Sequence, residues 1–270
     1  MALKNLMVHL DQCDRTAARV TMAVSLARQH KARLVGVFGQ TAGPQQVGVV
    51  ASWPSQEYVA ARDASKAAFE KATAGLPQAE WLDINRGSEA EVLRHITGHA
   101  RHFDLVILGQ HDERVKSCVP EELVGEVILN SGRPVLVLPY AGNFTEVGKR
   151  PLIAWNDARE AAHALNDSLP LIEGCEEAMV LSFSAQRDEA EYSCAEVSRH
   201  LASHGIKAKT EVMLVQDFGI MDMLLNRITD RGADLLIMGA HGHIGFPFVN
   251  HGAGTSYILG HMTVPVLMSN

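Results

Sequence analysis

The stretches "DLVILGQH" at residues 104–111 and "DLLIMGAH" at residues 234–241 are nearly identical, and they decide the fold. Each holds an apolar run of strand length that ends in glycine. Two further pairs of stretches match in the same order: "NLMVHLD" at 5–11 with "PLIAWND" at 151–157, and "RPVLVLP" at 133–139 with "VPVLMSN" at 264–270. Three matched strands in one order predict that the chain contains two copies of one structural unit.

Strand patterns alternate with helix patterns inside each copy. Between the short apolar runs, apolar residues recur at three- and four-residue spacing, as in residues 14–30. Helices between buried apolar strands predict crossover connections and a parallel sheet covered on both faces. We therefore predict an α/β protein with two tandem five-stranded parallel-sheet, Rossmann-like sandwich domains. We expect residues 1–140 to form the first domain, the polar residues 141–150 a linker, and residues 151–270 the second domain.

The composition is that of a globular protein. The chain has 270 residues, 47% of them hydrophobic, and a net charge of −7, so it can bury a full core. No apolar run approaches the ~20 residues of a membrane span, and Asp11 comes too early for a signal peptide. The four scattered cysteines show no CxxC spacing, which favours a reducing compartment. We therefore expect a cytoplasmic protein without a membrane partner, and the lack of a basic run argues against a nucleic-acid partner.

A glycine-rich loop follows the strand at residues 234–239. It reads "GAHGHIGFPFVNHGAG" and leads into a predicted helix that starts near Thr255 or Ser256. Ligands of parallel sheets bind beyond the carboxyl ends of the strands. Glycines allow a close backbone approach, and a helix start offers free N–H groups to an anion. The same residues also suit ordinary turns and caps, so the loop alone leaves a phosphate site and plain turn chemistry open.

The spacing of these glycines carries a resemblance to a known family. Gly239-xx-Gly242-x9-Gly252, after "DLLIMG" and before a helix and "PVL", resembles the G-xx-G-x9-G-(S/T) signature of universal stress proteins. The resemblance covers the whole chain as two tandem units and implies an adenine nucleotide alpha hydrolase-like fold. In ATP-binding members of the family this loop holds the ribose and phosphates. The resemblance thus implies a stress-survival module that responds to ATP or another adenine nucleotide such as AMP, bound by the second copy.

The resemblance also implies a set of nucleotide-binding residues in that copy. The candidates are Asn156, Phe183, Gly239, His241, Gly242, Gly252, Ala253 and Thr255. Ala253 stands where the family has Ser or Thr, so one phosphate donor is missing. Asn156 takes the place of an aspartate after the first strand, although a straight count against the first copy selects Asp157. Phe183 falls where adenine would lie, and Trp155 can either stack on the base or fill the pocket.

The first copy departs further from the family pattern. It keeps the strand-end aspartate as Asp11, but Asp112 and Glu122 replace the second and third signature glycines. Two carboxylates at the place of the phosphates would repel them. We expect the first copy to bind no triphosphate and to serve as a structural partner or to bind something neutral, with Asp11 acting as a loop or helix cap.

Other chemistry is less well supported by the sequence. Histidines cluster at His241, His243, His251 and His261, but no cysteine or carboxylate lies near them to complete a ligand set, so we predict no metal site. No general base is placed by spacing, so we predict no catalytic residue and, at most, weak ATPase activity. The alternatives left open are a slow ATPase and a structural or small-ligand-carrying scaffold that binds no nucleotide.

The last strand of each copy predicts an assembly. The last strand of a unit of this type lies at a sheet edge, where unpaired backbone groups invite a partner. Because both copies lie in one chain, "PVLVLP" and "VPVLMSN" can pair internally and make the chain a pseudo-dimer. A homodimer of whole chains is the other assembly left open.

Overall fold

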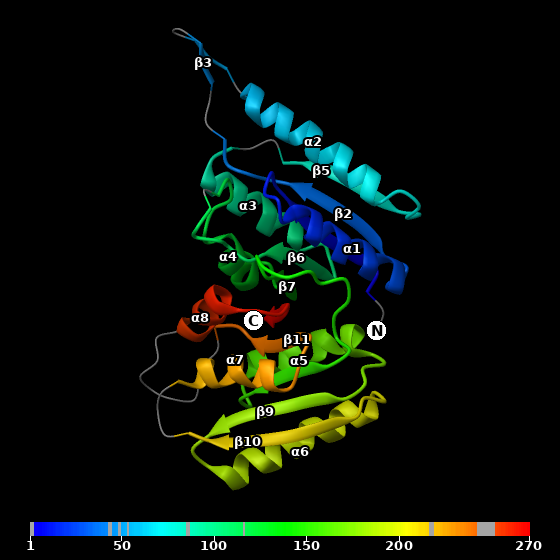
Figure 1. Cartoon of the computed structure of the whole chain (residues 1–270), viewed down its shortest axis with the longest axis vertical. Helices are drawn as coiled ribbons and strands as arrows, with labels where there is room; N and C mark the ends of the chain where they lie inside the picture. Colours follow the sequence, from blue (N-terminus) through cyan, green and yellow to red (C-terminus); the bar gives the residue numbers. More distant parts are fainter. Residues whose placement is uncertain are drawn as a thin grey trace. The chain divides into compact units, whose positions relative to one another are not determined.

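The chain folds into two compact units. The computed structural model describes residues 3–42, 45–47, 50–52, 54–84, 87–115, 117–215, 219–241 and 252–270. The first unit ends at Arg133, and the second runs from Pro134 to Asn270. Both units alternate strands and helices around parallel strands (Figure 1). The predicted α/β, Rossmann-like class is therefore confirmed.

The first unit has a parallel sheet in the order β6-β1-β2-β5. Its elements are β1 (Asn5–Leu10), α1 (Thr16–His30), β2 (Arg33–Phe38), β3 (Gln45–Val47), β4 (Val50–Ser52), α2 (Gln56–Ala72), β5 (Ala79–Asp83), α3 (Glu89–Ala100), β6 (Leu105–Gly109) and α4 (Leu123–Asn130). Strands β3 and β4 form a separate antiparallel pair. Helix α1 packs on β1, β2 and β6, and α2 packs beside it on β2 and β5.

The second unit has a sheet in the order β10-β9-β8-β11-β12-β7. Its elements are β7 (Val135–Leu138), β8 (Pro151–Trp155), α5 (Arg159–Ile172), β9 (Ala178–Ser184), α6 (Arg187–Ser203), β10 (Ala208–Leu214), α7 (Ile220–Asp230), β11 (Leu235–Gly239), α8 (Ala253–His261) and β12 (Val266–Ser269). All neighbouring strands are parallel except β7, which runs antiparallel to β12. Thus "PVLVL", which belongs to the first copy of the repeat, adds a strand to the second unit.

Local sequence explains where several helices begin. Ser88 caps α3: its hydroxyl accepts a hydrogen bond from the Glu91 N–H at 3.4 Å and donates to Glu91 Oε2 at 2.8 Å. Ser88 and Glu91 have the S-x-x-E spacing that is typical of a helix N-terminus. Ser55 caps α2 by accepting from the Tyr58 N–H at 3.2 Å. Strands β6, β7, β11 and β12 are apolar runs that are almost wholly buried, as expected for a sheet covered on both faces.

Residues 139–150, which include the expected linker, contain no helix or strand. Their end is nevertheless fixed to the second unit, because both Lys149 N–H and Arg150 N–H donate to the Asp234 carboxylate at 2.9 Å. Val147 is buried, with 8% of its surface exposed. The segment that precedes β8 is therefore part of the second unit's packing.

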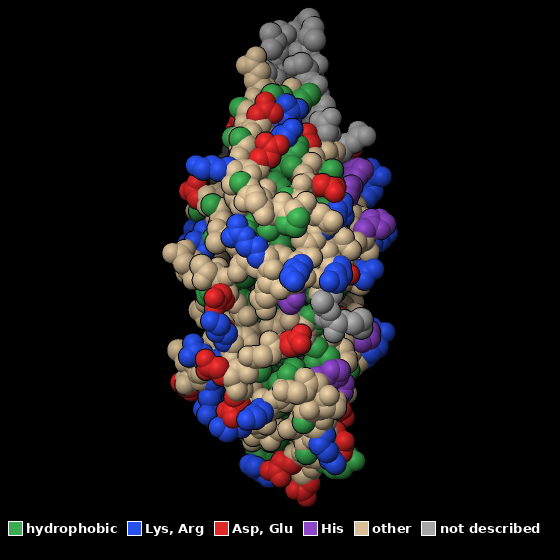
Figure 2. Space-filling view, turned by 90° about the vertical axis from the view of Figure 1, so that its right-hand side faces the viewer, with side chains coloured by type: hydrophobic (Ala, Val, Ile, Leu, Met, Phe, Trp, Pro, Cys, Tyr) green, Lys and Arg blue, Asp and Glu red, His purple; other side chains and the backbone are tan. Residues whose placement is uncertain are grey.

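The surface mixes both signs of charge. Figure 2 shows Lys and Arg side chains interspersed with Asp and Glu on the face drawn there. No helix in the described part of the chain is long and apolar enough to span a membrane. The four cysteines, at positions 13, 118, 175 and 194, are all free thiols.

Candidate functional site

A cavity of about 450 Å³ lies in the second unit, at the carboxyl ends of β8, β9 and β11. The first turns of α5 and α8, the first half of α6 and the start of α7 complete its wall. Its volume is within the range of small-molecule sites. Its place at the carboxyl edge of a parallel sheet is where the sequence predicts a ligand.

The structure brings most of the predicted residues together around this cavity. Asn156, Phe183, Gly239, His241, Gly252 and Thr255 line it, six of the eight candidates. Ala253 is the first residue of α8 and is exposed, but it does not line the cavity. Gly242 lies outside the described residues, as do His243 and His251. The nucleotide-binding roles of all eight remain predictions.

Gly239 lets the end of β11 approach the first turn of α5. A Cβ atom at this position would lie 2.5 Å from the backbone nitrogen of Ala161 and 2.8 Å from Glu160 Cβ. Backbone atoms in a helix cannot move aside for a methyl group, so the close contact requires glycine. The contact also places Glu160 beside the end of β11.

The start of α8 is held against the end of β11. The Thr255 hydroxyl accepts a hydrogen bond from the His241 N–H at 2.9 Å. Gly252, the N-cap, has a φ of +85°, and a Cβ there would lie 2.7 Å from His241 Nδ1. The first bond of α8 runs from Ser256 N–H to Gly252 O at 2.9 Å, so the preceding N–H groups of the first turn have no partner within the helix.

His241 presents a neutral imidazole at this point. It has a φ of +57°, which few non-glycine residues adopt. Burial lowers the pKa of its side chain below the ordinary value. Its Nε2 is buried and has no hydrogen-bond partner among the residues that the structure describes. Such a nitrogen is suited to a hydrogen bond with a bound ligand.

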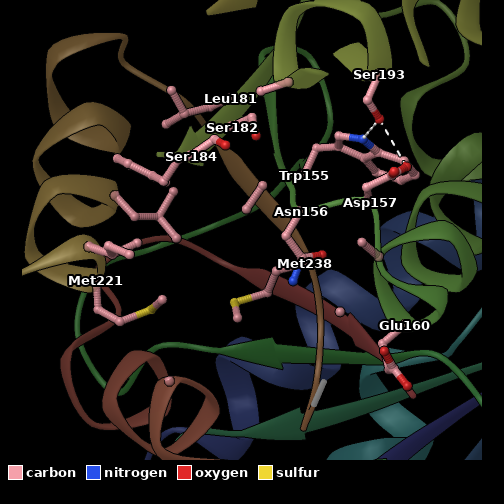
Figure 3. A pocket seen from close by; sticks show the side chains of 18 of the residues that line it. Trp155, Asn156, Asp157, Glu160, Leu181, Ser182, Ser184, Ser193, Met221 and Met238 are labelled. Atoms are coloured by element: carbon pink, nitrogen blue, oxygen red, sulfur yellow. Dashed lines mark hydrogen bonds between the residues drawn. The ribbon is translucent and has the colours of Figure 1, made fainter. Parts of the chain in front are cut away.

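Trp155 forms part of one wall without filling the cavity. Its indole N–H donates to Ser193 Oγ at 2.8 Å, and the Ser193 hydroxyl donates to Asp157 Oδ1 at 2.9 Å. Figure 3 shows these three hydrogen-bonded side chains on one side of the cavity and Met221 on the other. Asn156 and Met238 lie between them. The indole is therefore fixed by a hydrogen bond, and space remains beside it.

The sheet register makes Asn156 the counterpart of Asp11. In the second unit, Leu235 pairs with Pro151; in the first, Leu105 pairs with Leu6. The repeated stretches align Leu235 with Leu105, so Pro151 corresponds to Leu6 and Asn156 to Asp11. Local geometry agrees, since each side chain accepts a hydrogen bond from the N–H two residues later, at 3.3 Å for Asn156 and 2.8 Å for Asp11.

The rest of the cavity wall combines apolar side chains with carboxylates. Leu181, Met238 and, from α7, Ile220, Met221 and Leu224 form the apolar part. Asp157, Glu160 and Glu189 are the carboxylates, and none of the described lining residues is Lys or Arg. Residues 232–270, which include the whole signature loop, contain no Lys or Arg in their sequence. The site is thus apolar on one side and acidic, without a cation, on the other.

In the first unit, side chains of the unit itself occupy the corresponding edge. Arg19 from α1 donates to Asp11 Oδ2 at 2.7 Å and to the His9 carbonyl at 3.2 Å. A Cβ at Gly109, the counterpart of Gly239, would lie 2.5 Å from Arg19 Nη1. The pair is buried, with 5% of the Arg19 side chain and 7% of the Asp11 side chain exposed. Arg19 therefore fills the space beside the end of β6.

The charges in this cluster depend on one another. Burial opposes ionisation of Asp11, but Arg19, His9, the Thr16 hydroxyl and the Cys13 N–H outweigh it and lower the pKa of the carboxyl. Burial lowers the pKa of His9, whose Nε2 lies 2.7 Å from the Gly39 carbonyl oxygen. Asp11 therefore caps the turn that leads into α1, as the sequence predicts, and is also half of a buried ion pair.

The loop between β6 and α4 differs from the signature loop in charge. The Asp112 carboxylate pairs with the Arg114 guanidinium at 2.8 Å, and this hydrogen bond lowers the pKa of Asp112. Glu122 is the exposed N-cap of α4, where the second unit has Gly252. Further along the loop, the Cys118 carbonyl accepts from the Thr41 N–H at 2.6 Å.

Sequence reasoning missed part of the cavity wall. Ser193 and Glu189 lie on α6, and no motif connects that helix to the glycine loop. Glu160 follows the end of β8 by only five residues, so its place in the first helical turn was a signal that could have identified it. Met221 and Met238 also line the cavity, and no motif identifies them. Within the described ranges, no group of three or more His, Cys, Asp or Glu side chains could hold a metal ion.

Comparison with known proteins identifies the fold. No protein-family model and no curated protein matches the sequence. A universal stress protein from Archaeoglobus fulgidus DSM 4304 matches over 98% of this chain and 98% of its own, with a TM-score of 0.70 and 13% identity. A putative universal stress protein from Pseudomonas aeruginosa UCBPP-PA14 matches over 99% of this chain and 93% of its own, with a TM-score of 0.58 and 15% identity. A functionally unknown protein from Pseudomonas aeruginosa PAO1 matches over 99% and 92%, with a TM-score of 0.57 and 14% identity. The chain therefore has the fold of universal stress proteins over its whole length.

Proposed function

We propose that this chain is a tandem universal stress protein of the cytoplasm that binds an adenine nucleotide in its second unit. Binding would change the shape or the partner choice of a module used in stress survival, without turnover of the nucleotide. The observation that carries the proposal is the cavity of about 450 Å³, which is lined by six residues that the signature and the strand ends identified independently of the structure.

The chemistry of the wall suits each part of such a ligand. The apolar side chains of α7 and β9 offer a surface for a purine ring, because an aromatic base is stabilised by apolar contact. Asn156 has an amide that can donate and accept hydrogen bonds with a ribose or a base. The first turn of α8, held by Thr255 and opened by Gly252, offers backbone N–H groups to a phosphoryl group.

The first experiment identifies the ligand. The intact protein is purified, denatured, and the released small molecules are measured by mass spectrometry; calorimetry then titrates adenine nucleotides into ligand-free protein. We expect an adenine nucleotide in the released fraction or saturable binding in the titration. The absence of both would contradict the proposal and leave the scaffold alternative.

A variant locates the site. Gly252→Glu copies Glu122 of the first unit and places a carboxylate at the N-cap of α8. We expect it to weaken nucleotide binding at least about tenfold, since the new charge repels the phosphoryl group. Gly174→Glu is the matched control: Gly174 also has a left-handed φ, +81°, with nothing within 4 Å of a Cβ. An equal loss of nucleotide affinity in both variants would show that backbone strain, and not a charge in the site, weakens binding.

The slow-ATPase alternative is tested in the same preparation. We expect no phosphate release that depends on the cavity, because the sequence places no general base there by spacing. Release that disappears in the Gly252→Glu variant would favour the enzyme instead.

The assembly of the repeat is part of the proposal. Strand β7, the last of the first sequence copy, pairs antiparallel with β12, the last of the second, through Leu136 and Leu267 among others. This pairing supports the predicted pseudo-dimer of two copies within one chain. Size-exclusion chromatography with light scattering would distinguish a monomeric chain from a homodimer.

A further inference from the structure

The charges of the cavity limit the kind of nucleotide that it can hold. We propose, on the basis of the function proposed above, that the second unit selects an adenosine-class ligand with no more than one phosphoryl group and discriminates against di- and triphosphates. The proposal rests on three features of the site: the lack of Lys and Arg among its described lining residues, the position of Glu160, and the difference between the first turns of α5 and α8.

The first feature is the charge of the described wall. Three acidic residues line the cavity, none of the described lining residues is Lys or Arg, and the sequence from residue 232 to the end contains neither cation. A triphosphate carries several negative charges, and each needs a donor or a counter-ion in a site of low dielectric. One phosphoryl group can be held by backbone N–H groups alone. The described residues of the wall offer additional phosphoryl groups no cationic partner.

The second feature is the position of Glu160. The residue lies in the first turn of α5 and makes the close contact with Gly239 at the end of β11. Only 17% of its side chain is exposed. Glu160 therefore places a negative charge in the first turn of α5, where a chain of phosphoryl groups would otherwise find the positive end of a helix dipole.

Arg159 pairs with Glu160, but it does not supply a positive charge to the cavity. Arg159 Nη2 lies 3.3 Å from Glu160 Oε1, but 70% of the Arg159 side chain is exposed and the residue does not line the cavity. Asp157 accepts a hydrogen bond from the neutral Ser193 hydroxyl. The local charge that a ligand meets is therefore negative on the α5 side.

The third feature is the contrast between the two helix starts. Helix α8 has no acidic residue in its first turn, whereas α5 has Glu160 in its own. An anion is therefore favoured only at α8, beside His241 and Thr255. Because His241 is neutral at ordinary pH, it adds a hydrogen bond and no positive charge.

The test compares four ligands on the full chain. Adenosine, AMP, ADP and ATP are titrated by calorimetry in low salt with a metal chelator present. We expect AMP to bind at least about tenfold more tightly than ATP, and the difference to shrink as salt is raised, since salt screens the repulsion. ATP that binds as tightly as AMP, or becomes the tightest ligand when Mg²⁺ replaces the chelator, would overturn the inference while leaving the proposed function intact. Binding of none of the four would overturn the proposed function itself.

A pair of variants assigns the discrimination to one carboxylate. Glu160→Gln keeps the size of the side chain and removes its charge, so we expect ATP affinity to rise at least about threefold with little change for adenosine. Glu191→Gln is the matched control, because Glu191 pairs with Arg187 at 3.0 Å on the surface of α6 and does not line the cavity. An equal rise in ATP affinity in both variants, or no rise in Glu160→Gln, would show that the charge at the start of α5 does not discriminate against ATP.

Discussion

The buried ion pair of the first unit makes a strong prediction about stability. In the variant Arg19→Met, Asp11 loses the guanidinium at 2.7 Å and the His9 carbonyl loses a donor at 3.2 Å. Because the pair is 5% and 7% exposed, water cannot replace the missing partner fully. Removing one member of a buried pair leaves an uncompensated charge and typically costs about 3–5 kcal/mol. We expect a loss of that order in the free energy of unfolding of the first unit.

The measurement is a urea titration followed by tryptophan fluorescence. In a Trp155→Phe background the remaining tryptophans, Trp53 and Trp81, both precede residue 134, so the signal reports on the first unit. Arg33→Met is the matched control. It breaks an ion pair with Glu80 that has the same N–O distance, 2.7 Å, but in which 34% and 52% of the two side chains are exposed, and exposed pairs contribute little.

A second variant separates the charge from the packing. In Asp11→Asn with Arg19→Met, no buried charge remains, so we expect part of the stability lost in the single variant to return. If Arg19→Met lost no more stability than Arg33→Met, the pair would not be what holds the edge of the first sheet together. If the double variant lost more than Arg19→Met alone, the cost would lie in packing and not in charge.

Three further results are expected. Gly239→Ala should cost about 1–3 kcal/mol of unfolding free energy and lower nucleotide affinity, because its methyl group meets helix backbone at 2.5 Å; Gly98→Ala, with nothing within 4 Å, should cost nothing in the same denaturation assay. Burial lowers the pKa of His9, so the folded protein binds fewer protons than the unfolded chain just below pH ~6.5, and stability should fall as the pH drops through that window, by at most about 1.4 kcal/mol per pH unit for this group. Denaturation at several pH values checks this, and a His9→Gln variant with an unchanged slope would contradict it. Trp155→Phe removes the hydrogen bond to Ser193 at 2.8 Å and should cost about 1 kcal/mol; a thermal melt with no shift would show that the bond contributes nothing.

The sequence predicted the parts of the fold that repeat. The matched strands gave the order of elements in both copies because buried parallel strands are apolar runs that can be recognised without tertiary context. The same logic placed Asn156, since the end of a strand is also the edge of the sheet where ligands bind. A straight count pointed to Asp157, and only the pairing of Leu235 with Pro151 shows which residue corresponds to Asp11.

The remaining features depend on contacts between distant segments. Ser193 meets Trp155 across 38 residues of sequence, and nothing in either local pattern indicates that contact. Arg19 has the pattern of an ordinary polar residue of an amphipathic helix. Its side chain is nevertheless buried, because it occupies the space beside Gly109. Glu160 reads as a favourable first-turn acid, and its effect on a ligand becomes visible only when β11 is seen against α5.

The position of β7 bears on how the chain can be divided. The repeat in the sequence suggests a cut after residue 140. Residues 135–138, however, form β7, which pairs with β12 and belongs to the second unit. A fragment that starts at residue 141 would present the backbone N–H and C=O groups of β12 to solvent, and such an open edge invites aggregation. A fragment that starts at Pro134 keeps that edge covered, so the gene should be divided before β7 when the second unit is produced alone.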